Sequence, residues 1–184
     1  MKDKLILSGF ISMLFYSVAY PVVHTVVIQN LDSRVLSASS FISCILVIIV
    51  NKVWLTKSEK LYKKFGIMLF IEGFLYFVIL IMILLKTITP QTYYILDTLL
   101  FSSITRNIIC GGNRLKAIRY KDNDREEFDN KSVMFYNVAS IIGYGISSII
   151  KVPTNIAFVI MYVGIISDNF IYYIVYKQTN KDYN

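Results

Sequence analysis

The sequence has little of what metal, disulfide or nucleophilic chemistry requires. It contains a single histidine, His24, and two cysteines, Cys44 and Cys110, all within apolar stretches. It has no HExxH pattern and no cysteine pair at metal-ligand spacing, and one imidazole does not complete a metal site. No nucleophile with a nearby base is evident. We therefore expect no metal, no cofactor and no enzyme activity.

Charge is also scarce over long parts of the chain. Only 17% of the residues are charged and 55% are hydrophobic, and the charges gather in clusters between apolar blocks. A helix needs roughly 20 apolar residues to cross a hydrocarbon layer of about 30 Å. Blocks of that length cannot be buried in the core of so small a soluble protein. The composition predicts an integral membrane protein in a lipid bilayer, with no soluble domain.

Six apolar blocks are long enough to be membrane-spanning helices. We expect them at residues 5–29, 35–55, 65–85, 89–112, 132–152 and 155–176. Together they form one all-α, polytopic domain over residues 1–184. The basic start followed by an apolar run resembles a secretory signal, but the run is too long and lacks a small-residue cleavage site. We therefore assign it to the first span.

Basic residues are distributed unevenly between the two sides of the expected membrane. One side holds only Arg34, Lys86 and Lys151, whereas the remaining lysines and arginines outside the spans share a side with both termini. Because lysine and arginine concentrate in cytoplasmic loops, we expect both termini in the cytoplasm and the protein in the cell membrane. Basic residues beside anionic lipid account for the net charge of +7, so we expect no nucleic-acid partner.

Two inner connections are longer than the rest. Residues 51–64 are basic, and residues 113–131 mix both signs of charge. We expect both to be solvated connectors. The outer connections are too short to hold a folded module.

Ionisable and polar side chains inside the spans indicate where function is to be sought. An ionisable group at bilayer depth costs roughly 3 kcal/mol or more and is seldom found without a partner. The residues that we assign to a substrate or proton pathway on this basis are Tyr20, His24, Glu72, Asp97, Arg106 and Asp168.

Helical rise predicts which of these groups share a depth. Glu72 lies about 12 Å from Lys64, and Arg106 lies about 12 Å from Arg114, so the two can form a salt bridge. Asp168, on the last span, lies at a similar level and competes for the same arginine. Both pairings are hypotheses.

A second pair is predicted in the outer half of the membrane. His24 and Asp97 lie at similar depths below the outer ends of their spans, so they can touch if the first and fourth spans are neighbours. Two roles stay open for all these groups. They either neutralise one another and fix helix packing, or they line a substrate or proton pathway.

The first and fifth expected spans carry further signals. The outer half of the first is unusually polar, with Tyr16, Ser17, Tyr20, Pro21, His24 and Thr25. Lipid would not suit that stretch, so we expect it to line a cavity or another helix. On the fifth, Ala139, Gly143 and Ser147 form a small-xxx-small pattern that allows close helix contact.

The order of these features resembles one six-helix half of a major facilitator superfamily transporter. The most specific match runs over residues 100–112, where Arg106 is followed by Gly111 and Gly112, similar to the family's fourth-helix motif. Residues 125–128 and 139–145 are similar to the start and middle of the family's fifth helix. The resemblance covers most of the chain but is specific only over about residues 100–145.

The sequence also departs from the family pattern. Residues 51–66 keep basic charge and a late glycine but lack the family's Asp-Arg pair, with Glu59 the only acid. Full transporters of this family have two six-helix repeats with the substrate site between them, and this chain carries one.

Two functions follow from the resemblance and the buried charges. In the first, the chain is half of a transporter for a small solute, with proton coupling as one form of it, and it pairs with a second copy or another six-helix membrane protein. The resemblance then implies Arg106 as the residue that senses substrate or proton. In the alternative, the chain is a non-transporting accessory, immunity or scaffold protein whose buried ion pairs are structural.

Overall fold

The computed structural model describes residues 2–29, 31–120 and 122–183, and in these residues all regular structure is helical. The elements are α1 (Lys2–Ile28), α2 (Ser33–Tyr62), α3 (Phe65–Leu84), α4 (Pro90–Leu100), the π-helix η1 (Phe101–Thr105), α5 (Arg106–Arg119), α6 (Asp122–Ile149) and α7 (Thr154–Tyr183).

Five helices within the described part of the chain are long and apolar enough to cross a membrane. The qualifying stretches are Lys4–Ile28, Ser33–Tyr62, Phe65–Leu84, Asp124–Ile149 and Thr154–Asn180. Large apolar side chains cover their outer surfaces, among them Phe41 and Ile48 on α2 and Phe70 on α3. A soluble protein would not expose so many, whereas lipid covers them favourably. The protein is therefore membrane-embedded and all-α.

The fourth expected span, residues 89–112, corresponds to three consecutive helical pieces. α4, η1 and α5 follow one another without an intervening loop, and η1 has the wider π-helical turn. The hydroxyl groups of Ser102 and Ser103 donate to the carbonyls of Thr98 and Leu99, which accompanies the change in helix type. Single π-helical turns inside longer helices are frequent at functional sites. None of the three pieces alone is as long as the five spanning helices.

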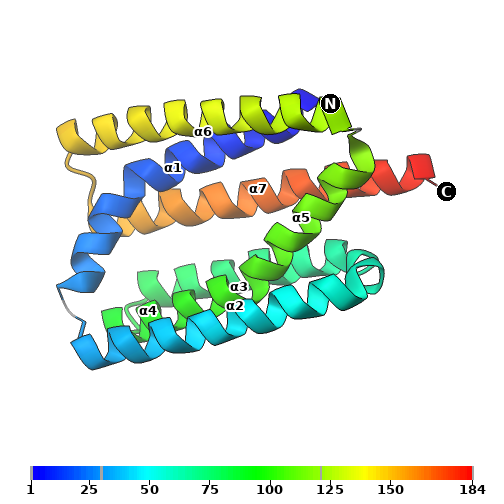
Figure 1. The fold of residues 1–184 in the computed structure, drawn as a ribbon. Helices are drawn as coiled ribbons and strands as arrows, with labels where there is room; N and C mark the ends of the chain where they lie inside the picture. Colours follow the sequence, from blue (N-terminus) through cyan, green and yellow to red (C-terminus); the bar gives the residue numbers. More distant parts are fainter. Residues whose placement is uncertain (1, 30, 121, 184) are drawn as a thin grey trace.

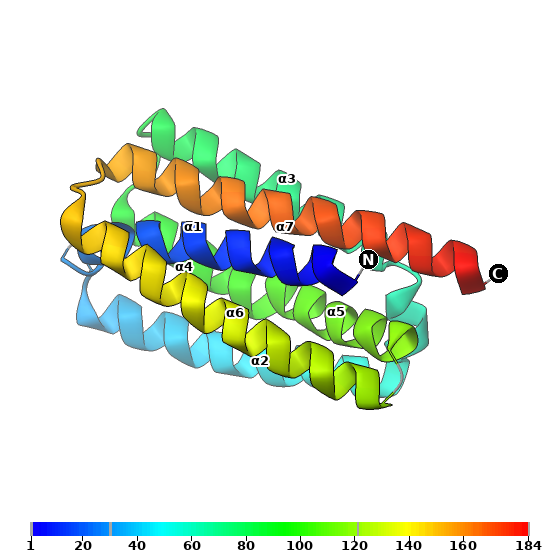
Figure 2. The same ribbon diagram turned by 90° about the horizontal axis from the view of Figure 1, so that it is seen from above.

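The helices pack in two layers, and α5 carries the chain from one layer to the other (Figure 1). α1 packs against α6 and α7 in one layer, and α2 packs against α4, η1 and α5 in the other. α3 belongs to the second layer but contacts α7 extensively, so this pair connects the layers. Seen from above, α3 lies along one long side of the molecule, and α2 and α6 lie along the opposite side (Figure 2).

α1 begins and α7 ends at the same end of the bundle, which also holds the α2–α3 and α5–α6 junctions (Figure 1). These junctions carry most of the basic residues, so the structure places the predicted basic side and both terminal helix ends together. Whether that end faces the cytoplasm stays a prediction.

The two long connectors expected at this end are mostly helical, which corrects the prediction. α2 continues to Tyr62, although Lys57 departs from helical geometry (φ −131°, ψ 26°), close to the predicted boundary at residue 55. α5 extends to Arg119, and α6 begins at Asp122. Ion pairs four residues apart, Lys131–Glu127 at 2.5 Å among them, support this charged helical extension of α6.

Two apolar clusters occupy the two ends of the bundle. The first, near the termini, includes Leu5, Phe65, Leu115 and Tyr176. The second, at the opposite end, includes Ala19, Val23, Tyr76, Phe158 and Tyr162. Polar side chains lie between the clusters, and they form the site described below.

The small residues of α6 bring it close to α1, as the sequence pattern predicts. Ala139 is fully buried, and a Cβ added at Gly143 would lie 2.6 Å from Ser17 Cβ and 3.0 Å from the Leu14 carbonyl oxygen. Gly145, two residues further, has nothing within 4 Å of an added Cβ. The two glycines therefore differ in whether packing requires them.

We expect Gly143→Ala to lower stability by about 1–3 kcal/mol, because the methyl group forces α1 and α6 apart. Gly145→Ala is the matched control and should leave the melting temperature equal or higher, since alanine favours the helix. Thermal unfolding in detergent measures both variants. Equal melting temperatures for the two would contradict the close α1–α6 contact.

Candidate functional site: a polar cavity between two helix layers

Glu72 is the most deeply buried carboxylate side chain among the described residues, with 1% of its surface exposed. One carboxyl oxygen, Oε1, accepts a short hydrogen bond from the Thr105 hydroxyl, and Oε2 accepts one from Asn169 Nδ2 at 2.7 Å. Thr105 in turn bonds to the Tyr76 hydroxyl at 3.1 Å. The carboxyl group therefore joins α3, η1 and α7 through neutral partners.

The predicted salt bridge between Glu72 and Arg106 is not formed. Among the described residues, no ion pair joins Arg106 to Glu72 or to Asp168; the arginine Nε instead donates to Asn51 Oδ1 on α2 at 2.9 Å. Consecutive residues of a helix point about 100° apart. Because Thr105 is directed at α3, the neighbouring Arg106 is directed at α2.

Arg106 belongs to a small polar network that attaches α5 to α2. Asn51 also accepts a 3.6 Å contact from the Cys110 thiol, and the buried Trp54 donates from Nε1 to Asn107 Oδ1 at 2.7 Å. All of these partners are neutral. The network fixes the α2–α5 contact beside the π-helical turn, and no carboxylate of the described residues pairs with the arginine charge.

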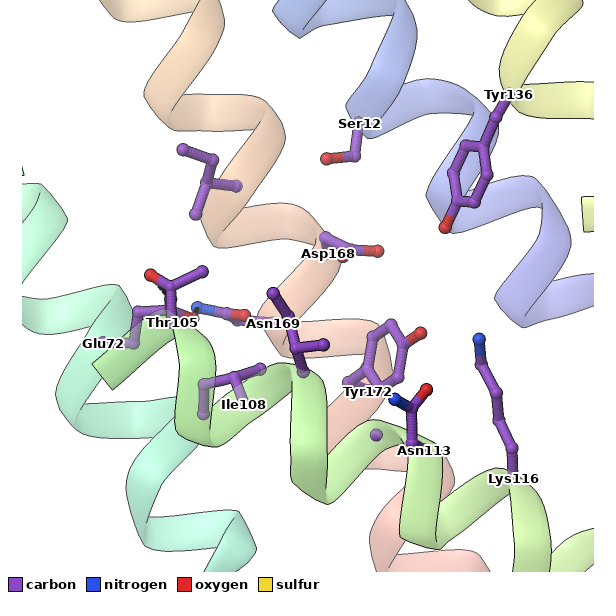
Figure 3. A pocket seen from close by; sticks show the side chains of 13 residues that line it. Ser12, Glu72, Thr105, Ile108, Asn113, Lys116, Tyr136, Asp168, Asn169 and Tyr172 are labelled. Carbon is purple, nitrogen blue, oxygen red and sulfur yellow. Dashed lines mark hydrogen bonds between the residues drawn. The ribbon is translucent and has the colours of Figure 1, made fainter. Parts of the chain in front are cut away.

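A cavity of about 310 Å³ lies between the layers next to Glu72 (Figure 3). α1, α3, η1, α5, α6 and α7 all contribute to its walls. Its polar lining consists of Ser12, Glu72, Thr105, Asn113, Lys116, Tyr136, Asp168, Asn169 and Tyr172. The cavity therefore reaches from the depth of Glu72 to Lys116, near the end of the bundle that holds the termini.

Asp168 and Lys116 are the other two charged groups of the cavity. Asp168 Oδ1 accepts a 2.5 Å hydrogen bond from the Ser8 hydroxyl on α1. The Lys116 ammonium lies 5.4 Å from the centre of the Phe128 ring. Lys116 lies one helical turn beyond the predicted span at residues 89–112. The cavity thus combines two acids and one base.

The outer-half residues form a separate group. His24 is exposed and stacks on Tyr20, which stacks on Tyr16, along one side of α1. No hydrogen bond or ion pair joins His24 to Asp97 among the described residues, so the predicted pair is not formed. Asp97 instead lies close enough to Tyr16 and Tyr76 for a carboxylate charge there to interact with both phenol groups.

The sequence indicated the buried carboxyl groups of the site but not the residues around them. Thr105, Asn169 and Lys116 contribute as much to the site as the predicted residues do, and Tyr136 and Tyr172 complete its wall. Asn169 directly follows Asp168 in an apolar helix, which was an available signal. Nothing in the sequence marked Thr105, because the direction of its side chain depends on the π-helical turn. In the described residues, no histidine, cysteine, aspartate and glutamate side chains gather as a metal site.

Comparison with protein-family models, with curated proteins and with solved structures finds no match to this chain. The resemblance to the major facilitator superfamily therefore stays a prediction from the sequence.

A double-mutant cycle tests the Glu72 contacts. We expect Glu72→Met and Asn169→Leu to be coupled by about 1 kcal/mol or more, because each removes the partner of the other. Glu72→Met and Arg106→Gln should add within about 0.5 kcal/mol, since they share no bond. Thermal unfolding of the single and double variants measures both coupling free energies. Strong coupling to Arg106 with none to Asn169 would contradict the geometry.

Proposed function

We propose that the protein is a transporter half for a small solute, inserted in the cell membrane with both ends in the cytoplasm. It completes its pathway by pairing with a second copy or another six-helix membrane protein, and proton movement accompanies transport. The observation that carries the proposal is the polar cavity at the depth of Glu72, because charged groups around an internal space at bilayer depth mark substrate and ion pathways.

A line of polar groups supports the proton-coupled form. It starts near Asp97, continues from the Tyr76 hydroxyl to Thr105 and Glu72, and reaches the cavity at Asn169. A carboxyl group that is bonded only to neutral donors can lose and regain a proton without breaking an ion pair. Glu72 is the central carrier in this proposal, and Asp97 and Asp168 are its neighbours toward the two ends.

Exposed polar groups on α1 and α6, two helices that pack against each other, support pairing. They are His24 on α1 and Asn137 and Tyr144 on α6. Lipid tails offer such groups no hydrogen bonds. A second six-helix unit against this side would cover them, whereas the opposite side, at α3, exposes Phe70 and Phe74 and suits lipid.

The contacts between helices support the family resemblance and a sixth crossing. We treat α4–η1–α5 as one helix and exchange α1 with it, α2 with α6, and α3 with α7. This exchange converts the α1–α6 contact into the α2–α5 contact. The same exchange converts α1–α7 into α3–α5 and leaves α3–α7 unchanged. Halves of major facilitator transporters are built from two such three-helix repeats. We therefore take α4–η1–α5 as the sixth crossing.

Pairing predicts a two-unit complex in native mass measurement from mild detergent. Ile141 on α6 and Ile71 on α3 are both exposed isoleucines. Their two helices lie along opposite long sides of the molecule (Figure 2). Ile141→Trp, between Asn137 and Tyr144, should weaken the complex at least tenfold, and Ile71→Trp should leave it unchanged. A chain that is strictly monomeric when purified, and that cross-links to nothing in its native membrane, would contradict pairing.

Transport is tested in vesicles whose internal pH is followed while solutes are added outside. Amino acids, sugars, organic acids and organic cations are added one class at a time. We expect one class to acidify the interior, Glu72→Gln to abolish the change, and Glu59→Gln, an exposed acid outside the cavity, to retain it. If no class moves protons, the proposed function is contradicted.

A further inference from the structure

Four groups of the cavity point to the chemical class of the solute. Figure 3 shows Asp168, Tyr136, Tyr172 and Lys116 directed toward a common region of the cavity. They come from three helices, α7, α6 and α5. Their arrangement places a carboxylate and an ammonium on different walls of one small space.

These groups have few partners in the described part of the chain. Asp168 has one bond, from Ser8 to Oδ1, and neither tyrosine hydroxyl has a hydrogen bond there. Lys116 contacts the Phe128 ring but forms no ion pair with Asp168 among the described residues. Half-buried polar groups without partners are costly, and a molecule in the cavity relieves that cost.

Glu72 does not compete for the same role. Both of its oxygens are already bonded, to Thr105 and to Asn169. Among the described residues of the lining, Asp168 therefore offers a carboxylate oxygen, Oδ2, without a hydrogen bond, and Lys116 offers an ammonium group without an ion pair. The tyrosine hydroxyls between them can donate or accept.

We infer that the cavity binds a small zwitterion, whose cationic group contacts Asp168 and whose anionic group contacts Lys116. A ligand with only a positive charge would be repelled by Lys116 and would leave it unpaired. A ligand with only a negative charge would be repelled by Asp168 and would leave that carboxylate unpaired. The volume of about 310 Å³ is at the lower end of ligand pockets, roughly 300–1,000 Å³, so the solute is small. The inference rests on the proposed function in taking this cavity as the solute site.

Binding is tested by thermal shift on the purified protein, without vesicles. The probes are glycine, alanine and γ-aminobutyrate, each compared with the amine and the carboxylate that carry only one of its charged groups. We expect at least one zwitterion to raise the melting temperature with saturation, and its single-charge analogues to bind at least tenfold more weakly. Equal binding of an amine or a carboxylate alone would overturn the inference.

Substitutions test whether Asp168 and Lys116 bind the two charged groups of the zwitterion. Asp168→Asn and Lys116→Met should each weaken binding at least tenfold, and Lys116→Arg should restore most of it. The controls are Glu59→Gln and Lys177→Met, which removes another lysine that lies over an aromatic ring, Tyr173. Retained helix content by circular dichroism shows that each variant folds.

The outcomes separate this inference from the proposed function. Zwitterion binding by a protein that moves no solute overturns the transporter alone. Transport of another solute class, with no zwitterion binding by the folded wild type, overturns this inference alone. Undiminished binding by both Asp168→Asn and Lys116→Met also overturns it.

Discussion

Burial of the Glu72 carboxyl group is the constraint on which the middle of the bundle depends. A carboxyl group without water must have hydrogen-bond partners, and Thr105 and Asn169 supply them from η1 and α7. These two bonds join helices of both layers at one level. Apolar clusters pack on either side of that level, at Phe65 and at Tyr162. The polar layer therefore lies between two apolar ends, and its cavity extends toward Lys116 at the end that holds the termini.

Much of the fold follows from the sequence, because apolar length and basic asymmetry are strong signals in a membrane protein. Five of the expected spans coincide with long apolar helices. The segments thought to be connectors are helical instead, since i,i+4 charge pairs such as Lys131–Glu127 stabilise helix as readily as they suggest a solvated loop. The π-helical turn at Phe101–Thr105 had no sequence signal, and the sequence showed no internal duplication behind the exchangeable helix contacts.

The site was predictable in its residues but not in its pairings. Helical rise gave the common depth of Glu72, Arg106 and Asp168, yet depth says nothing about rotation around the helix axis. That rotation directs Thr105 rather than Arg106 at Glu72 and sends the arginine to Asn51. Neutral partners such as threonine and asparagine are common in helices, so composition could not single them out.

Cysteine accessibility tests the cavity most directly. Ser12 on α1 lines it, whereas Ser17 on the same helix is fully buried against Gly143. In a background with Cys44→Ser and Cys110→Ser, a membrane-impermeant thiol reagent is added to the side that carries the basic junctions. We expect Ser12→Cys to be labelled and Ser17→Cys to stay unlabelled. Protection of both cysteines from both sides of the membrane would contradict an accessible cavity at this depth.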